Sequence, residues 1–170
     1  MTEKRNRRLK DYINKIARHI ANYCIDSGIG TVVFGWNQGI KQEVSMAKRN
    51  NQNFVQLPTA RLKERLKVVL SETGVKFVET EESYSSKASF LDGDEIPVFG
   101  NKPEKWKASG KRTATKLYRT AKGWIVNADC NGAANILKKV ASILDLDLSE
   151  ITRGSVTCPT RLNLYPTVLV

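Results

Sequence analysis

A short, uninterrupted apolar run behind an amphipathic helix is the feature of this sequence that most restricts its fold. The run Gly30–Gly35 is continuously apolar and β-branched, which is typical of a buried central strand, more often paired in parallel. Ahead of it, apolar residues recur at the three- and four-residue spacing of a helix, at Leu9, Ile13, Ile16, Ile20 and Tyr23. A helix that leads into a buried strand favours a layered α/β architecture.

The next elements repeat this order. A second helix is expected to begin near Pro58 and Thr59, a proline and a capping residue, and to end at Gly74. The apolar run Val75–Val78 then predicts a strand, so the order helix, strand, helix, strand favours parallel pairing through a crossover. Polar residues over 36–56 predict a loop, and the apolar spacing after Asn127 predicts a third helix.

The charge of the chain indicates an anionic partner. Of 170 residues, 28 are Lys or Arg and 17 are Asp or Glu, which gives a net charge of +11. One basic cluster lies within residues 1–20, and a second, over 102–122, is interleaved with Trp106, Tyr118 and Trp124. Such clusters suit a nucleic acid, because cations neutralise phosphates and rings stack on bases; a solvated basic surface is the alternative. On charge alone, the expected phosphate contacts are Lys111, Arg112, Lys116 and Arg119.

Composition also excludes several classes of protein. No run approaches the roughly 20 apolar residues that span a bilayer, and residues 1–10 do not form a secretory signal. An anionic membrane surface is a less favoured partner than nucleic acid, because neither basic cluster has a clear apolar face of Leu, Phe and Trp. The three cysteines are Cys24, Cys130 and Cys158, and the single histidine is His19. These four scattered residues do not make a zinc site or a disulfide framework, so we expect free thiols in a reducing, cytoplasmic compartment.

Carboxylates are the plausible catalytic groups. Glu81 and Glu82 follow the strand Val75–Val78 directly, and Asp129 lies at the start of the third helix. Carboxylates that converge at strand ends and helix starts hold Mg²⁺ ions that clamp a phosphodiester and activate water. On pattern alone the alternatives stay open: Asp129 as a helix-dipole carboxylate, and Glu81–Glu82 as a solvated strand end.

Two sequence blocks add a resemblance. The stretches Glu81–Lys87 (ESYSSK after the first glutamate) and Asn127–Leu137 (NADCNGAANIL) resemble conserved blocks of the TnpB (OrfB) family. Members of that family are transposon-encoded, RNA-guided DNA nucleases, often described as transposases and similar to type V CRISPR effectors. The stretches Gly35–Gln42 and Asn50–Val55 resemble one branch of the family, and the likeness extends over roughly Lys4 to Thr160.

The resemblance implies a fold and a set of metal ligands. The fold would be α/β and RNase H-like (RuvC-like): a mixed sheet flanked by helices, with Mg²⁺-binding acids at strand ends. The last catalytic aspartate of the family matches Asp129. The central glutamate usually lies in a strand that corresponds to Val32–Asn37, where Phe34 takes its place. Some relatives, including the Fanzor proteins, carry a relocated glutamate that matches Glu82, which we prefer to Glu81.

This sequence departs from the family pattern in two ways. Residues 88–126 contain no cysteine, so no zinc ribbon is expected, and a basic insertion over 88–123 stands in its place. The first catalytic aspartate of the family would precede Met1. The sequence therefore predicts an N-terminally truncated RuvC-like domain over 1–148 and an irregular tail over 149–170.

Three functional hypotheses follow from the truncation. The first is a nuclease fragment that is inactive alone, because two-metal catalysis needs carboxylates that hold both ions. The second is a non-catalytic remnant that binds DNA and guide RNA, alone or beside a full-length relative or the missing N-terminal half. The third is a decaying reading frame that folds poorly.

Overall fold

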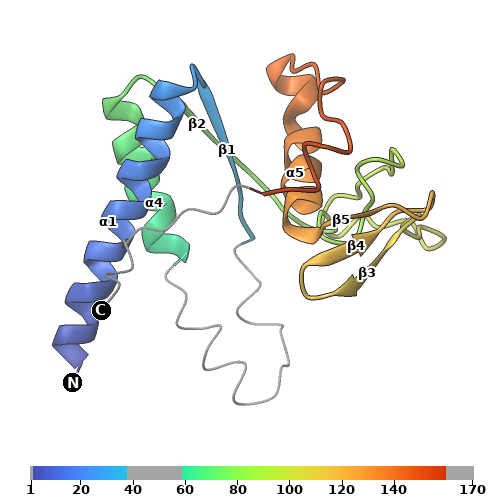
Figure 1. Cartoon of the computed structure of the whole chain (residues 1–170), viewed down its shortest axis with the longest axis horizontal. Coiled ribbons are helices and arrows are strands. Elements are labelled where there is room, and N and C mark those ends of the chain that lie inside the picture. Colours follow the sequence, from blue (N-terminus) through green and yellow to red (C-terminus); the bar gives the residue numbers. More distant parts are fainter. Residues whose placement is uncertain (1, 38–58, 160–170) are drawn as a thin grey trace. The chain divides into compact units, whose positions relative to one another are not determined.

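The computed structural model describes residues 2–37 and 59–159, which divide into two compact units (Figure 1). Within the described residues, the first unit contains 2–34 and 59–78, and the second contains 35–37 and 79–159. Most of the loop expected over 36–56, and the motif Asn50–Val55, lie outside the described residues.

Two helices form the first unit and confirm the helices expected from the spacing of apolar residues. They are α1, Thr2–Asp26, and α4, Thr59–Glu72, which pack side by side (Figure 1). Their core is formed by small residues of α1 against branched residues of α4: Ala17, Ala21, Cys24, Leu66, Val69 and Leu70. The seam of α1 therefore differs from the expected stripe, because Tyr23 is 52% exposed. Alanine at the seam lets the two helices approach closely.

The two strands expected after these helices are also confirmed. They are β1, Thr31–Gly35, and β2, Lys76–Thr80, which pair as a two-stranded sheet. The Lys76 amide donates to Gly30 O at the start of both strands, and the Trp36 amide donates to Thr80 O at their ends. The pairing is therefore parallel. All five residues of β1 are only half-buried, because in the described part of the chain β1 has a single partner strand, so the expectation of a fully buried central strand is wrong.

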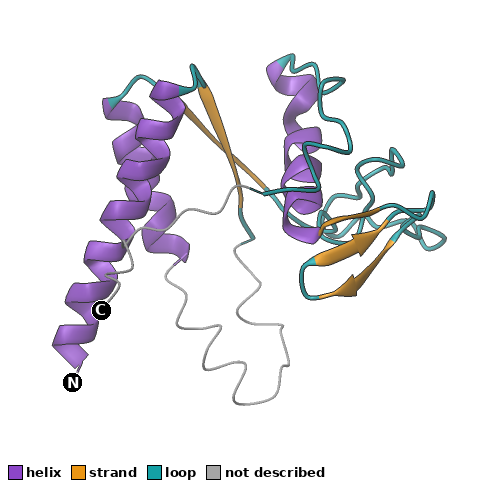
Figure 2. Cartoon of the chain, viewed as in Figure 1, coloured by secondary structure: helices purple, strands orange, loops and turns teal. Residues whose placement is uncertain are grey.

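The second unit is built on three short antiparallel strands and one helix. The strands are β3, Lys111–Ala114, β4, Leu117–Arg119, and β5, Ile125–Asn127, in the order β3-β4-β5. The helix α5, Ala128–Leu144, follows β5 without a loop and confirms the expected third helix. Figure 2 shows that the long connection between β2 and β3 consists of loops and turns.

Sequence signals at both ends of α5 explain its bounds. The side chain of Asn127 accepts hydrogen bonds from the amides of Asp129 and Cys130, as an N-cap residue does. At the other end, Asp145 adopts the left-handed conformation with φ 51°, and its amide donates to Ala141 O, which stops the helix.

The described part of the chain thus has a mixed α/β fold of helices and two small sheets. None of its helices has the length and apolarity needed to cross a membrane.

The packing of α4 gives a direct test of the first unit. We expect Leu70→Ala to lower the free energy of unfolding by about 2–5 kcal/mol, because Leu70 is fully buried and its truncation leaves a cavity. Val68→Ala, on the exposed side of the same helix, serves as the control and changes it by less than about 1 kcal/mol. Urea denaturation of both variants makes the comparison, and equal losses would contradict the assigned core.

Candidate metal and nucleic-acid site

Two fully buried asparagines of α5 hold the loop that follows β2. The Nδ2 group of Asn131 donates to Ala88 O at 2.8 Å, and its Oδ1 accepts from the Phe90 amide at 3.0 Å. The Nδ2 group of Asn135 donates to Ser85 O and Ala88 O, both at 2.8 Å. The two asparagines of the NADCNGAANIL block therefore fix the loop that carries the ESYSSK block, so these two blocks, distant in sequence, form one structural element.

Two aspartates organise the basic insertion. Asp92 accepts from the Ser89 hydroxyl at 2.6 Å and from the Ala121 amide at 2.7 Å. Asp94 accepts from the Ser89 amide at 2.7 Å, from the Ser109 amide at 3.0 Å and from the Ser109 hydroxyl. Because these carboxylates bridge segments up to 29 residues apart, they hold together a region that has little regular structure of its own.

Glu81 forms an ion pair with a buried lysine. Its carboxylate accepts from the Lys139 Nζ of α5, whose side chain is only 8% exposed, and from the Ser83 amide at 2.8 Å. Burial raises the pKa of Glu81, but the hydrogen bonds from Lys139 and Ser83 and the charge of Lys139 lower it more, so the net pKa lies below its ordinary value. The negative charge of ionised Glu81 is therefore already balanced within the fold by Lys139.

Glu82 has the opposite environment. Burial, and then the negative charge of Glu81, raise its pKa above the ordinary value, and the charge of Lys139 opposes them only in part. Its backbone amide donates to the Oδ1 of Asn37 at 3.2 Å, which fixes the chain at this point. Because Lys139 compensates the negative charge of ionised Glu82 only in part, a cation bound beside Glu82 would be stabilised.

Asp129 lies in the first turn of α5, and its backbone amide donates to the Oδ1 of the N-cap residue Asn127 at 2.9 Å. Its carboxylate is 71% exposed and accepts from the guanidinium of Arg112 at 3.2 Å. The helix dipole favours a negative charge at this position. The carboxylate is thus open to solvent, and Arg112 is its ionic neighbour.

The structure brings Glu81 and Glu82 together around Lys139, and Asp129 together with Arg112. The placement of Glu82 beside Asp129 stays a prediction. Within residues 2–37 and 59–159 there is no group of three or more His, Cys, Asp or Glu side chains that could hold a metal ion. The donor set of Glu82 and Asp129 suits Mg²⁺ in type and number, because Mg²⁺ is commonly bound by one or two carboxylates together with waters and substrate phosphates.

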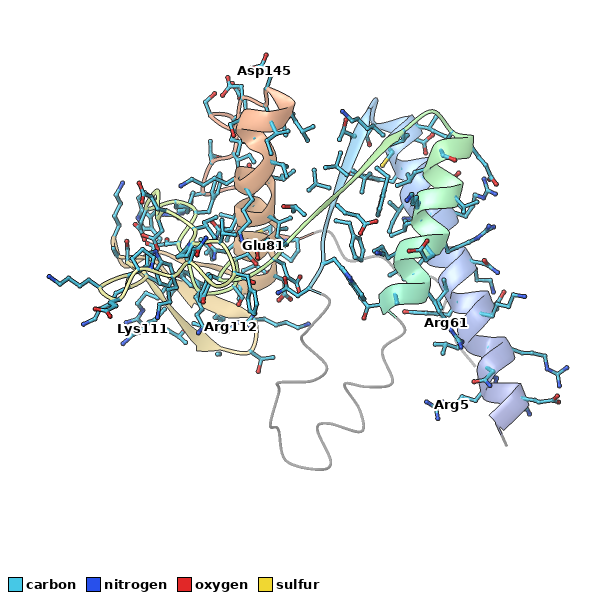
Figure 3. All side chains as sticks on the ribbon, turned by 180° about the vertical axis from the view of Figure 1, so that it is seen from behind. Arg5, Arg61, Glu81, Lys111, Arg112 and Asp145 are labelled. Carbon is cyan, nitrogen blue, oxygen red and sulfur yellow. The ribbon has the colours of Figure 1, made fainter. Side chains whose placement is uncertain are left out.

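The four predicted phosphate contacts lie on or beside one β-hairpin. Lys111 on β3 is directly opposite Arg119 on β4, and Arg112 is opposite Tyr118. Opposite residues share a face of the sheet, so Lys111 and Arg119 form an exposed cationic pair, whereas Arg112 is on the face of Tyr118. Lys111 and Arg112 are labelled in Figure 3. Lys116 lies in the turn between the strands.

The aromatic residues of the second basic cluster make contacts within the fold, whereas the sequence predicted that they would stack on bases. Tyr118 is fully buried, and its hydroxyl donates to Lys87 O at 2.8 Å, so it is not available to stack on a base. The Trp106 indole donates to Glu95 O at 2.8 Å. Lys122 and Arg153 lie over the Trp124 ring at 5.2 and 5.6 Å. Alternation along β4 explains the error for Tyr118, since it points to the face opposite its basic neighbour Arg119.

Comparison with known proteins supports the fold class. No protein-family model and no curated protein matches the sequence. Among solved structures, the chain is similar to a chain of the Cas12f1–sgRNA–target DNA complex determined by cryo-electron microscopy. The TM-score is 0.55 at 23% sequence identity, over 79% of this chain and 35% of that one. The likeness shows a shared fold, and this chain spans about a third of the length of its neighbour.

The asparagine pair gives a test of how the site is held. We expect Asn135→Ala to lower the free energy of unfolding by about 2 kcal/mol, because Ser85 O and Ala88 O lose a donor. The same substitution also removes the Oδ1 of Asn135, which is buried without a hydrogen-bond partner among the described residues. Removing this unfavourable group offsets part of the destabilisation. Asn101→Ala, on an exposed turn, is the control; chemical denaturation distinguishes the two, and an unchanged Asn135→Ala would refute the role.

Removing the charge of Glu81 and removing the charge of Glu82 should change the stability of the fold in opposite directions. Glu81→Gln leaves Lys139 buried without its counter-ion and should destabilise the fold by about 2 kcal/mol at pH 7. Glu82→Gln should stabilise it at pH 7 without divalent metal, because it removes a carboxylate whose ionisation the fold disfavours.

Their pH dependence follows from the directions of the two pKa shifts. The stability due to Glu81 is present above its unfolded pKa, about 4.3, and is lost as the pH falls through its lower folded pKa. The penalty due to Glu82 appears as the pH rises through its raised folded pKa. Thermal melts between pH 3 and 8 measure both, and shifts of the same sign at pH 7 would contradict the assignment.

Proposed function

We propose that this chain is the RuvC-like portion of a TnpB (OrfB)-type, transposon-encoded, RNA-guided DNA nuclease. The observation that carries the proposal is the fold it shares with a chain of the Cas12f1–sgRNA–target DNA complex, over 79% of its length. The ESYSSK and NADCNGAANIL blocks support it independently, because the residues that resemble the family also contact each other through Asn131 and Asn135.

In this proposal Glu82 and Asp129 hold Mg²⁺. The raised pKa of Glu82 indicates a carboxylate that a cation would stabilise, and the exposed Asp129 is accessible to a shared ion. When bound, Mg²⁺ supplies neutralisation of the phosphodiester charge and activation of a water. Glu81 is assigned no ligand role, because Lys139 already neutralises it.

The hairpin supplies the contacts to nucleic acid. Like charges directly opposite one another destabilise an antiparallel pair, so Lys111 beside Arg119 lowers the stability of the free hairpin. A phosphate between the two cations removes that repulsion. This arrangement supports a DNA or guide-RNA backbone as the partner and is the physical basis for assigning Lys111 and Arg119 as phosphate contacts.

A non-catalytic nucleic-acid-binding protein is the second candidate. It is favoured by the ion pair between Asp129 and Arg112 and by the lack of a three-acid group in the described ranges. Because two-metal cleavage depends on carboxylates that position both ions about 4 Å apart, we expect the isolated chain to show little or no nuclease activity.

Metal-dependent stabilisation separates the two candidates. A ligand at ten times its Kd stabilises the folded state by about 1.4 kcal/mol, so 10 mM Mg²⁺ should raise the Tm of the wild type by several degrees if its Kd is roughly 1 mM. Glu82→Gln and Asp129→Asn should lose this shift. Glu104→Gln, an exposed glutamate in the insertion, should keep it.

Equal Mg²⁺ shifts in all variants, or none in the wild type, would contradict the metal site and favour the second candidate. The same preparations, incubated with supercoiled plasmid and Mg²⁺ or Mn²⁺, test the expected inactivity. Robust nicking that Asp129→Ala abolishes would show instead that the chain is catalytically sufficient.

A further inference from the structure

A basic groove lies between α1 and α4 in the first unit, away in sequence from every residue assigned above. Its volume is about 560 Å³. Besides Ile13, the residues that line it are four cations and two amides, with no carboxylate among them: Arg7, Lys10, Arg61, Arg65, Asn6 and Asn14. Figure 3 shows Arg61 near the start of α4.

Two of these residues, Asn6 and Lys10, occupy positions of α1 at which helix packing alone would place apolar side chains. In α1 the buried seam runs through Ile13, Ala17, Ala21 and Cys24. At helical spacing the same stripe continues toward the N-terminus through Asn6 and Lys10. In α4, Leu62 continues the apolar stripe of Leu66, Val69 and Leu70, and Arg61 and Arg65 lie beside that stripe. On α1 the seam thus changes from apolar to polar and cationic toward the N-terminus, and on α4 two cations border it.

This arrangement costs stability in the free protein. Like charges on adjacent helices repel one another, and Arg61 lies in the first turn of α4, where the helix dipole disfavours a cation and no acidic residue is present. Among the described residues, Arg7 has an ion pair with Glu3, but both side chains are at least 80% exposed at 3.7 Å, so the pair contributes little. An anion in the groove would compensate these charges.

The Nε of Arg65 points to the same conclusion. It is buried and has no hydrogen-bond partner among the described residues, and an unpaired buried donor of a charged group is unfavourable. A guanidinium presents its donors in a fixed fork that matches phosphate oxygens. Arg65 therefore has unused hydrogen-bonding capacity next to a groove lined by three further cations.

We propose that this groove binds the phosphodiester backbone of a nucleic-acid strand. Arg7, Lys10, Arg61 and Arg65 neutralise phosphates, and the amides of Asn6 and Asn14 donate to phosphate or sugar oxygens. From Asn6 to Asn14 a helix rises about 12 Å, which corresponds to about three phosphates of one duplex strand. The inference extends the proposed function, on which it rests, by adding a second backbone contact on the helical unit.

Binding assays with charge-matched variants test it. Arg7→Gln/Lys10→Gln and Arg61→Gln/Arg65→Gln each remove two groove cations. Arg5→Gln/Arg8→Gln, on the opposite side of α1, removes the same charge outside the groove, and Lys67→Gln is a single-charge control for α4. The probes are single-stranded RNA and DNA of one sequence and the corresponding DNA duplex, titrated between 50 and 500 mM salt, with melting curves recorded for every variant.

Each groove variant should weaken binding roughly tenfold at 0.1 M salt and reduce the slope of log Kd against log salt by about 1.4 for single strands, since each phosphate contact contributes about 0.7. The controls should change the slope by less than half of that. Because Arg7 and Lys10 are exposed, their variant keeps the test valid if Arg65 is needed for folding. Loss with RNA alone or with DNA alone identifies the strand that is bound, and loss with both shows recognition of the shared backbone.

The outcomes separate this inference from the proposed function. If Lys111→Gln/Arg119→Gln weakens binding but both groove variants bind as the controls do, the groove inference is overturned and the proposed function stands. If the wild-type chain binds none of the probes, both are overturned.

Discussion

The hydrogen bonds from two buried asparagines of α5 are the interactions on which the rest of the second unit depends. The segment after β2 has no strand or helix to satisfy its backbone, yet Ser85, Ala88 and Ser89 are buried. Buried carbonyls without partners are costly, so this segment can be buried only where side-chain amides replace the missing ladder. Asn131 and Asn135 do this from one face of one helix.

That anchoring has a consequence for the acidic residues that precede it. Once the loop is fixed to α5, Lys139 of the same helix meets Glu81 and neutralises it. The adjacent Glu82 receives the burial and the repulsion without equal compensation. Two neighbouring carboxylates whose pKa values are shifted in opposite directions are a common sign of divided roles: Glu81 forms the ion pair with Lys139, and Glu82 is the group to which the proposed function assigns a cation.

Much of the local structure could be predicted from the sequence, because helices and strands leave a periodic signal. The bounds of α4 and α5 followed from Thr59, Gly74 and Asn127. Pairings across long separations leave no such signal. Lys139 lies 58 residues from Glu81, and Asp92 lies 29 from Ala121. The motif around Asn131 and Asn135 was visible, but its structural role was not, since an amide that binds backbone looks the same in sequence as one that binds a ligand.

The buried seam and the aromatic residues show a second limit. The expected stripe of α1 included Tyr23, whereas small residues form the contact, because two closely packed helices have room for Ala17 and Ala21 and not for a ring. Tyr118 was grouped with basic neighbours, although strand alternation turns it into the core. In both cases the type of residue suggested one environment and its position in the element determined another.

Net charge alone does not identify a partner, because a charge of +11 spread over outward faces would simply be solvated. Arg5, Arg8 and Lys67 show that arrangement: they are exposed and do not line the groove. The informative cations are those whose placement opposes folding. Lys111 faces Arg119 across a strand pair, and Lys10 continues the apolar seam of α1 beside Arg61 and Arg65 of α4. Local conflict of this kind is expected at functional sites, and under the proposed function a nucleic-acid backbone would turn the repulsion between these cations into binding energy.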